Sequence, residues 1–237
     1  MQARTVLRQE RKFLIHTEQY YRFSRQLKQM LKEDIHNGTD GYLVRSLYFD
    51  TMQDKDYQEK LSGIEYRRKI RMRLYSPDSP VAYLEMKQKQ GANQRKRSLA
   101  VPKEDALEVM KGHYEVLLGY RDAFAAECYG IMKTQCYIPR VIVEYDRMAF
   151  ICQENNTRIT FDRNIRSSVM TGTLFAQDAK CVPALHPGAV VLEVKYDHFL
   201  LSYVKKALQT VNKSEVSVSK YVTARQASFR FLRGKYE

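Results

Sequence analysis

Four cations alternate with mostly apolar residues in the segment YRRKIRMRLY (66–75). They occupy every second position: Arg67, Lys69, Arg71 and Arg73. Side chains on a β-strand alternate between its two faces, so these four would share one face, with Arg68 as the single cation on the other. Like charges in a row repel one another, so an anion is expected beside them. A solvated edge strand, whose charges block aggregation, is the alternative that this segment leaves open.

The same alternation recurs in five other segments with strand character. They are QERKFLI (9–15), YLEMKQKQ (83–90), VIVEYDRMAF (141–150), TRITFD (157–162) and VLEVKYD (191–197). Some of their cations have a carboxylate two residues away. If such strands closed into a barrel, charge would line its interior, and buried charge needs water and a counter-charge. The recurrence therefore favours an enclosed anion-binding face over a solvated edge.

The residue types on these faces suit phosphate. Arginine donates through a planar fork that matches phosphate oxygens, and lysine acts as a point charge. The few carboxylates could hold a divalent metal that bridges phosphate oxygens. A formal net charge of +13 also indicates a polyanionic partner. The five histidines are scattered, and none is assigned a role.

The chain alternates between segments typical of strands and of helices. Strands are predicted at 6–15, 42–51, 66–75, 81–90, 95–101, 140–151, 157–166 and 189–197. Helices are predicted at 17–36, 53–63, 198–212 and 219–234, the last capped by Ser219 and ended by Gly234, and a helical block at 102–112, ended by Gly112, and 114–135. The chain of 237 residues shows no internal linker, so residues 1–237 are predicted to form one domain. The fold class expected is α+β with an antiparallel sheet or barrel.

No two of the four cysteines form a C-x-x-C pair, and no cysteine has a histidine at the spacing found in zinc fingers. Reduced thiols in a cytoplasmic protein are the expectation. The first residues lack the apolar run of a signal peptide, and no segment approaches the ~20 apolar residues of a membrane helix. A soluble protein without a membrane span is therefore predicted.

Eight segments in order resemble the VTC domain of polyphosphate polymerases, in the triphosphate tunnel metalloenzyme superfamily. They are QERKFLI, SLYFDT, KIRMRLY, YLEMKQKQ, VEYDRMAF, RITFD, VLEVKYD and VSKY. The resemblance covers nearly the whole chain. It implies a tunnel formed by an eight-stranded antiparallel β-barrel with helices packed outside. It also implies metal-dependent transfer of the ATP γ-phosphate onto inorganic polyphosphate, with Mn²⁺ or Mg²⁺ as cofactor.

The resemblance also implies roles for individual residues. The side chains expected to act in the transfer are Arg71, Arg73, Lys87, Arg147 and Lys220. Those expected to bind phosphate are Lys12, Lys89, Lys96, Tyr145, Arg158, Lys195 and Ser219. Because Arg95 and Arg97 flank Lys96, the basic position of the family could correspond to any of these three residues. The metal ligand implied is Glu193, with Glu85 and Glu10 as further candidates.

Two other functions remain open at this point. A tripolyphosphatase or nucleoside triphosphatase would use the same tunnel, but hydrolytic members of the superfamily often begin with Glu-x-Glu-x-Lys. Here Arg8 stands at the first of these positions, before Glu10 and Lys12. A non-catalytic binder of polyphosphate or nucleic acid is the third hypothesis. The partners expected are ATP and inorganic polyphosphate, with no specific nucleic acid and with a membrane-protein partner for product export.

Overall fold

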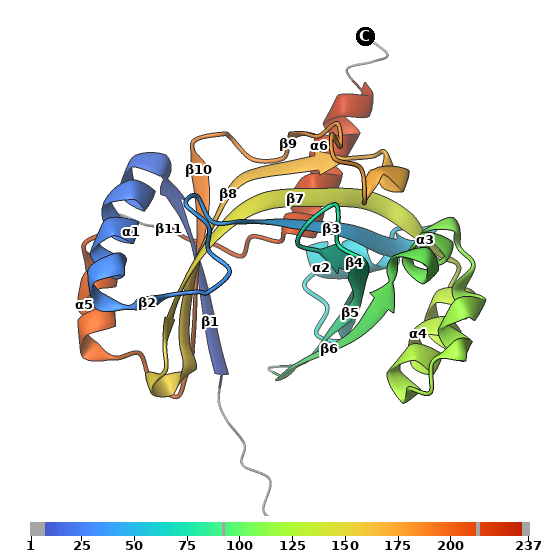
Figure 1. The fold of residues 1–237 in the computed structure, drawn as a ribbon, viewed down its shortest axis with the longest axis horizontal. Coiled ribbons are helices and arrows are strands. Elements are labelled where there is room, and N and C mark those ends of the chain that lie inside the picture. Colours follow the sequence, from blue (N-terminus) through green and yellow to red (C-terminus); the bar gives the residue numbers. More distant parts are fainter. Residues whose placement is uncertain (1–7, 92, 212–213, 234–237) are drawn as a thin grey trace, which may run out of the picture. The chain divides into compact units, whose positions relative to one another are not determined.

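The structure is a computed structural model that describes residues 8–91, 93–211 and 214–233 (Figure 1). Within these residues an antiparallel sheet of eleven strands is accompanied by helices, which confirms the α+β class. The main strand order is β11-β1-β10-β8-β7-β3-β4-β5-β6, with β2 beside β7 and β9 beside β8. Among the described strands no pairing joins β6 to β11. The antiparallel sheet is thus confirmed, whereas its closure into a barrel stays a prediction.

The long strands follow the predicted segments closely. They are β1 (Arg8–His16), β3 (Tyr42–Thr51), β4 (Arg67–Leu74), β5 (Val81–Gln90), β6 (Asn93–Pro102), β7 (Tyr137–Cys152), β8 (Thr157–Ser168) and β10 (Ala189–Asp197). The short ones are β2 (Lys32–Glu33), β9 (Val182–Pro183) and β11 (Ser214–Glu215). The α-helices are α1 (Thr17–Met30), α2 (Lys55–Leu61), α3 (Lys103–Lys111), α4 (Ala123–Thr134), α5 (Ser202–Gln209) and α6 (Lys220–Arg233). Three 3₁₀ turns are η1 (Tyr114–Gly119), η2 (Glu154–Asn156) and η3 (Thr171–Thr173).

The chain divides into two compact units, each assembled from three segments. The first unit comprises Met1–Leu43, Tyr145–Ile165 and Leu185–Val218. The second comprises Val44–Glu144, Arg166–Ala184 and Ser219–Glu237. Strands β3, β7 and β8 contribute residues to both units.

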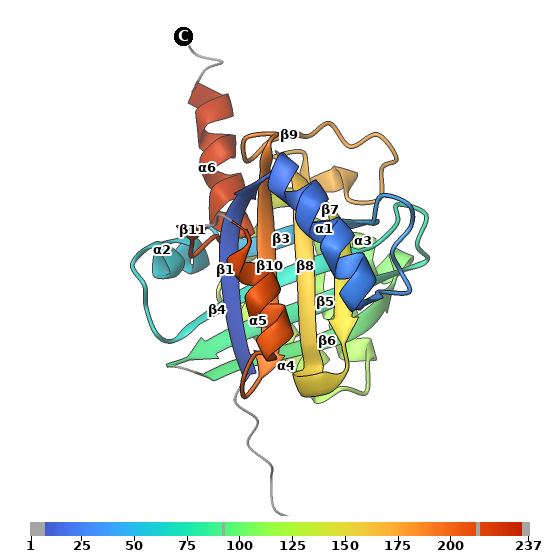
Figure 2. The ribbon, with the colours of Figure 1, turned by 90° about the vertical axis from the view of Figure 1, so that its left-hand side faces the viewer.

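In the first unit, α1 and α5 cover the apolar face of β1, β10 and β8 (Figure 2). Phe161 of β8 lies at the centre of this core. Its ring makes edge contacts with Tyr20 and Phe23 of α1, at centroid distances of 5.1 and 5.8 Å. Val204 of α5 is buried in the same cluster. Because these strands turn their apolar residues toward the helices, their charged residues point to the opposite face.

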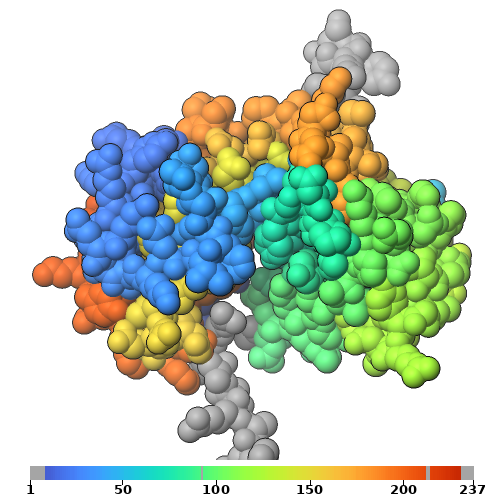
Figure 3. Space-filling view, in the orientation of Figure 1, coloured from blue at the N-terminus to red at the C-terminus, as the bar shows by residue number. Residues whose placement is uncertain are grey.

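In the second unit, α3, η1 and α4 cover the apolar face of the β4–β5–β6 strands. Ile70, Met72 and Leu84 are fully buried there, in one cluster with Val109 of α3 and Cys128 of α4. This helical layer forms the green, continuous surface at the right of Figure 3. The apolar parity of the segment 66–75 therefore faces a core, as the alternation predicts.

Two predicted helices have different limits in the structure. The first ends at Met30 rather than at residue 36, because Leu31 is extended and Lys32 and Glu33 pair with β7. Ile35, which lies within the predicted helix 17–36, is 84 % exposed. In the block 102–135, α3 ends at Gly112 as predicted, with a φ of 92° in the left-handed conformation, but the segment predicted at 114–135 opens with the 3₁₀ turn η1. A new helix, α4, then begins beyond the N-cap Asp122, whose carboxylate accepts hydrogen bonds from the backbone N–H groups of Phe124 and Ala125.

The last helix begins where it was predicted. The hydroxyl of Ser219 accepts a hydrogen bond from the backbone N–H of Val222 at 3.4 Å, and α6 starts at the next residue, Lys220. Its predicted end, Gly234, lies outside the described residues. All four cysteines are free thiols. No helix in the described part of the chain has the length and apolar character needed to cross a membrane.

Candidate functional site

The register of the second unit places the predicted cations in rows across the sheet. Lys69 of β4 pairs with Lys87 of β5, which pairs with Lys96 of β6. In the adjacent row, Tyr48 of β3 pairs with Arg71, which pairs with Glu85. Directly opposed like charges repel across a sheet, so the row of three lysines concentrates positive charge on this face. The alternation in the sequence therefore predicts the face of each cation correctly.

Glu85 lies at the centre of this arrangement, which we call the Glu85 cluster (Glu85, Arg71, Arg73 and Lys96). Its carboxylate is 2.6 Å from Nη2 of Arg71 and 3.8 Å from Nη1 of Arg73, and it also pairs with Nζ of Lys96. Burial raises the pKa of Glu85, but Arg71, Arg73 and Lys96 outweigh it and lower the pKa to about 2. The carboxylate is therefore ionised, and its three partners together keep the cluster cationic.

Hydroxyl groups on β3 orient the two arginines of the cluster. The hydroxyl of Tyr48 accepts a hydrogen bond from Nη1 of Arg71 at 3.0 Å, and that of Ser46 accepts one from Nε of Arg73 at 3.1 Å. Burial raises the pKa of Tyr48, yet the charges of Arg71 and Arg73 outweigh it, so the net shift is downward. Sequence reasoning missed both hydroxyls. Their spacing of two residues in SLYFDT was the available signal.

Ser219 and Lys220 belong to the same unit as these rows. Nζ of Lys69 donates to Oγ of Ser219 at 2.9 Å, which joins the start of α6 to the lysine row. The hydroxyl of Tyr221 donates to the fully buried Asp50 at 2.5 Å, and its ring stacks on Tyr48 with centroids 5.1 Å apart. These contacts fix the N-terminus of α6, where backbone N–H groups favour anions. Lys69, which was not predicted as a site residue, thus joins the lysine row to the start of α6.

The support of α6 includes a second buried carboxylate, Asp56, next to Asp50. Tyr137 donates to both oxygens of Asp56 at 3.0 Å. Burial and the neighbouring charge of Asp50 raise the pKa of Asp56 to about 7. Because folding favours the protonated form, this contribution to stability is complete below the unfolded pKa and is lost as the pH rises through about 7.

We therefore expect Asp56→Asn to change how stability depends on pH. Between about pH 4 and pH 7 the wild type should lose up to roughly 4 kcal/mol from this one group, and the variant should not. Urea unfolding of both proteins across this range measures the difference in slope. Identical slopes would show that folding does not raise the pKa of Asp56.

The first unit carries a second charged face, built from two cross-strand rows. One row contains Lys12, Glu193 and Thr160, and the other contains Glu10, Lys195 and Arg158. We call the charged residues Glu10, Lys12, Glu193 and Lys195 the Glu193 cluster. Nζ of Lys12 pairs with Glu10 and lies 3.7 Å from Oε2 of Glu193, whose other oxygen pairs with Lys195. The two glutamates therefore share Lys12.

Arg147 and Arg158, on the same unit, are held by buried carboxylates. Arg147 makes a bidentate ion pair with Asp162 at 2.7 and 2.9 Å, and its guanidinium lies 5.2 Å from the ring centre of Tyr145. Burial opposes the charge of Arg147, but Asp162 outweighs burial and raises its pKa. Nη2 of Arg158 donates to Asp34 at 2.7 Å. Neither Asp34 nor Asp162 was predicted as part of the site.

The structure also separates the residues whose match was ambiguous. Lys96 contacts Glu85, whereas Arg97 contacts Glu127 of α4 on the opposite face. Arg95 has the same parity as Arg97 and pairs with Gln88. Of the three, only Lys96 shares the face of the Glu85 cluster. Lys89 lies one row beyond the lysine row, opposite Gln94.

The donor set of the Glu193 cluster fits a divalent metal that takes its remaining ligands from a substrate. Within the described residues no group of three acidic, histidine or cysteine side chains could hold an ion alone. Mg²⁺-type sites commonly use one or two carboxylates together with substrate phosphate oxygens. Glu193 and Glu10 provide two such carboxylates around Lys12. Glu85 is engaged by three cations, so its geometry is better suited to orienting them.

Two solved structures share this fold at low sequence identity. A protein from Bacillus halodurans assigned as an adenylate cyclase aligns with a TM-score of 0.51 and 16 % identity, covering 89 % of this chain and 92 % of that one. HpAC1 from Hippeastrum, described as a candidate adenylyl cyclase with a dominant triphosphatase activity, aligns with a TM-score of 0.57 and 12 % identity, covering 94 % and 96 %. No curated protein sequence matches significantly.

The sequence profile of one family covers nearly the whole chain. The VTC domain profile matches residues 7–229, a span that contains every residue of the Glu85 and Glu193 clusters. The resemblance drawn from the eight segments is thus confirmed, and the chain belongs to the VTC domain family.

Proposed function

We propose that residues 1–237 act as one catalytic domain, a metal-dependent phosphotransferase that moves the γ-phosphate of ATP onto inorganic polyphosphate. The observation that carries the proposal is the row Lys69–Lys87–Lys96 beside the Glu85 cluster. Such a row concentrates positive charge along one face, where lysine and arginine side chains can bind the successive phosphates of a chain. Membership of the VTC domain family supports the same substrate class.

The reaction class follows from what the two clusters can supply. Phosphoryl transfer depends mainly on positioning and on neutralising phosphate charge. Arg71, Arg73 and Arg147 have fixed guanidinium groups for that purpose. The acceptor is a terminal phosphate that is already ionised near neutral pH, so no general base is required. A cluster rich in arginine and lysine, without a histidine in its ion pairs, suits this chemistry.

A divalent metal, when bound, would supply further neutralisation of the phosphate oxygens. Glu193, with Glu10 beside it, would hold the metal. Lys12 and Lys195 lie against these carboxylates and would move toward phosphate oxygens when the metal takes their place. The metal itself, Mn²⁺ or Mg²⁺, is part of the proposal.

A single incubation distinguishes transfer from hydrolysis. The purified protein is incubated with ATP and either Mn²⁺ or Mg²⁺, and the products are resolved by gel electrophoresis alongside a phosphate assay. Long phosphate chains support the transferase. Free phosphate without chains supports the second candidate, a triphosphatase, which the activity described for HpAC1 brings into consideration. If neither phosphate chains nor free phosphate form, both enzyme hypotheses are rejected and a binding protein is favoured.

The substrate class has its own test, in the melting temperature. A ligand that binds only the folded state stabilises it. We expect tripolyphosphate to raise the melting temperature clearly, by about 5 °C or more at saturating concentration. Duplex DNA at equal phosphate concentration should raise it far less, because the tunnel that the family resemblance implies would be too narrow to admit a duplex. Equal protection by DNA would favour a nucleic-acid-binding protein over both enzymes.

The partners proposed for the chain follow from this function. They are ATP and inorganic polyphosphate, and export of a polyanionic product would require a separate membrane protein. No specific nucleic-acid partner is proposed.

A further inference from the structure

The face of β4, β5 and β6 opposite Glu85 carries cations that the proposed reaction does not use. Arg68, Gln88 and Arg95 form one cross-strand row on this face. Arg97 lies in the next row, opposite Met86. We call Arg68, Gln88, Arg95 and Arg97 the outer hairpin face. Arg68 is the cation that breaks the apolar alternation of the segment 66–75.

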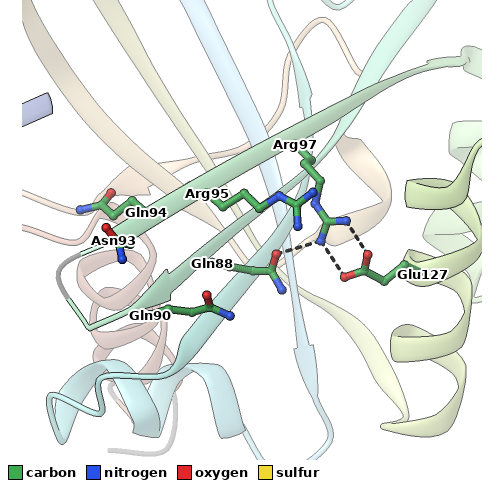
Figure 4. Close-up of a pocket in the computed structure, with 7 residues that line it drawn as sticks. All are labelled: Gln88, Gln90, Asn93, Gln94, Arg95, Arg97 and Glu127. Atoms are coloured by element: carbon green, nitrogen blue, oxygen red, sulfur yellow. Dashed lines mark hydrogen bonds and ion pairs between the residues drawn. The ribbon is translucent and has the colours of Figure 1, made fainter. Parts of the chain in front are cut away.

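A pocket of about 150 Å³ opens on this face, near the β5–β6 turn (Figure 4). Seven residues line it: Gln88, Gln90, Asn93, Gln94, Arg95, Arg97 and Glu127. Four of the seven are carboxamides, whose NH₂ groups can donate to oxygen. None of the seven is aromatic, so the pocket lacks the stacking surface that single-stranded nucleic acid commonly uses.

Arg97 is the fixed part of the pocket. Its Nη2 donates to Oε1 of Glu127 at 2.6 Å and to Oε1 of Gln88 at 2.8 Å, and Nη1 also pairs with Glu127. The guanidinium lies 4.8 Å from the ring centre of Phe124. Within the described residues its Nε is buried without a hydrogen-bond partner. Arg97 and Glu127 therefore form a rigid wall rather than two mobile surface charges.

Arg95 differs from Arg97 in exposure and in contacts. It is exposed, and the described residues include no hydrogen-bond or ion-pair partner for it. The pKa of Glu127 is lowered, chiefly by its hydrogen bond from Arg97. The positive charges of Arg97, Arg95 and Arg68 lower it further. Three guanidinium groups thus act on one carboxylate. An oxyanion in the pocket would meet the free fork of Arg95 and the neighbouring carboxamides, which is the donor set that phosphate prefers.

We propose that the outer hairpin face binds a phosphate group of a polyphosphate chain that is also bound at the Glu85 face of the same hairpin. The proposal rests on the proposed function. Lys89 and Gln90 are adjacent on β5 and point to opposite faces, and they pair with Gln94 and Asn93. One residue of a strand spans about 3.3 Å, so the last cation of one face and the pocket on the other are separated by little more than the edge of the hairpin.

A long chain can contact both faces, whereas tripolyphosphate can occupy only one. The second contact is then intramolecular and raises the affinity without changing the first site. The outer hairpin face would therefore select for chain length. It would hold a long acceptor in place between transfer steps, while leaving the binding of short substrates unchanged.

The test compares long-chain polyphosphate with tripolyphosphate. Equilibrium binding of both ligands is measured at one fixed salt concentration for the wild type, Arg95→Ala and Arg68→Ala/Arg95→Ala. The control Lys205→Ala/Lys206→Ala removes the same charge as the double variant, from exposed positions on α5. We expect the double variant to lose about tenfold in affinity for the long chain relative to the control, and to keep its affinity for tripolyphosphate. The single variant keeps Arg68, whose charge partly offsets the rise that burial causes in the pKa of Asp56, so it should lose part of this affinity and should unfold like the wild type.

Three results would overturn the proposal. One is a loss for the long chain no greater than that of the control. Another is an equal loss of affinity for both ligands, which would reflect only the overall electrostatic field of the protein. The third is a comparable loss for duplex DNA, which would make this face a nucleic-acid site. The proposed function fails separately, when the wild type neither makes chains from ATP nor binds tripolyphosphate.

Discussion

Alanine at both Arg71 and Arg73 is expected to abolish most binding of tripolyphosphate and ATP. Each arginine should contribute about 1.5–3 kcal/mol, the usual scale for a hydrogen bond to a charged group. This corresponds to roughly 10- to 150-fold in affinity for each single variant. Both guanidinium groups are pre-oriented, by the hydroxyls of Tyr48 and Ser46, so little ordering is left to oppose binding. Isothermal titration with tripolyphosphate in the absence of metal measures the loss directly.

The structure also indicates which controls this experiment needs. Removing both arginines leaves the buried Glu85 with Lys96 as its remaining partner in the cluster, so part of the effect could come from a disturbed carboxylate. Adding Glu85→Gln to the double variant removes that charge and restores a neutral site. Glu85→Gln alone should bind tripolyphosphate as tightly as the wild type or more tightly, because a competing anion is gone. Unchanged binding in the folded double variant would exclude the Glu85 cluster as the phosphate site.

Glu193→Gln is expected to remove most metal-dependent turnover. The substitution keeps the shape of a side chain that is 6 % exposed and removes its charge. A metal held by Glu193 would lose a ligand, and a fall in kcat of about 100-fold or more is expected from weaker neutralisation of the phosphate oxygens. Binding of tripolyphosphate without metal should stay similar or tighten, since Lys12 and Lys195 would lose the anion they now pair with.

The competing role for Glu193 is that of an ion-pair partner for Lys195. In that case Glu193→Gln would disturb stability or metal-free binding and leave the dependence on Mn²⁺ intact. Glu215→Gln is the matched control, because Glu215 lies in the same unit and pairs with Arg11 at the exposed strand β11. Turnover and metal titrations of the two variants separate the roles. Full Mn²⁺-dependent activity in Glu193→Gln would shift the metal site to Glu10 or Glu85.

The faces of the sheet were predictable from the sequence because the alternation of side chains on a strand is local. Arg71 and Arg73 share a face of β4, and Glu85 and Lys87 share a face of β5, for no reason other than a period of two residues, and the same period separates Lys96 from Arg97. The buried face of these strands was equally predictable, since the apolar side chains of Ile70 and Leu84 must be buried for the sheet to be stable. The order of the eight segments also sufficed to identify the family.

Contacts between distant segments could be found only in the tertiary structure. Glu85 meets Arg71 and Lys96 because strand register aligns β4, β5 and β6, and register depends on how every strand packs. The hydrogen bond from Lys69 to Ser219 joins residues 150 positions apart, and the ion pair of Arg158 with Asp34 joins residues 124 apart. Helix α1 ends early because Lys32 and Glu33 gain strand partners on β7, an interaction that no local pattern encodes. Local periodicity thus determined which side chains could bind phosphate, and long-range packing decided which of them are held together.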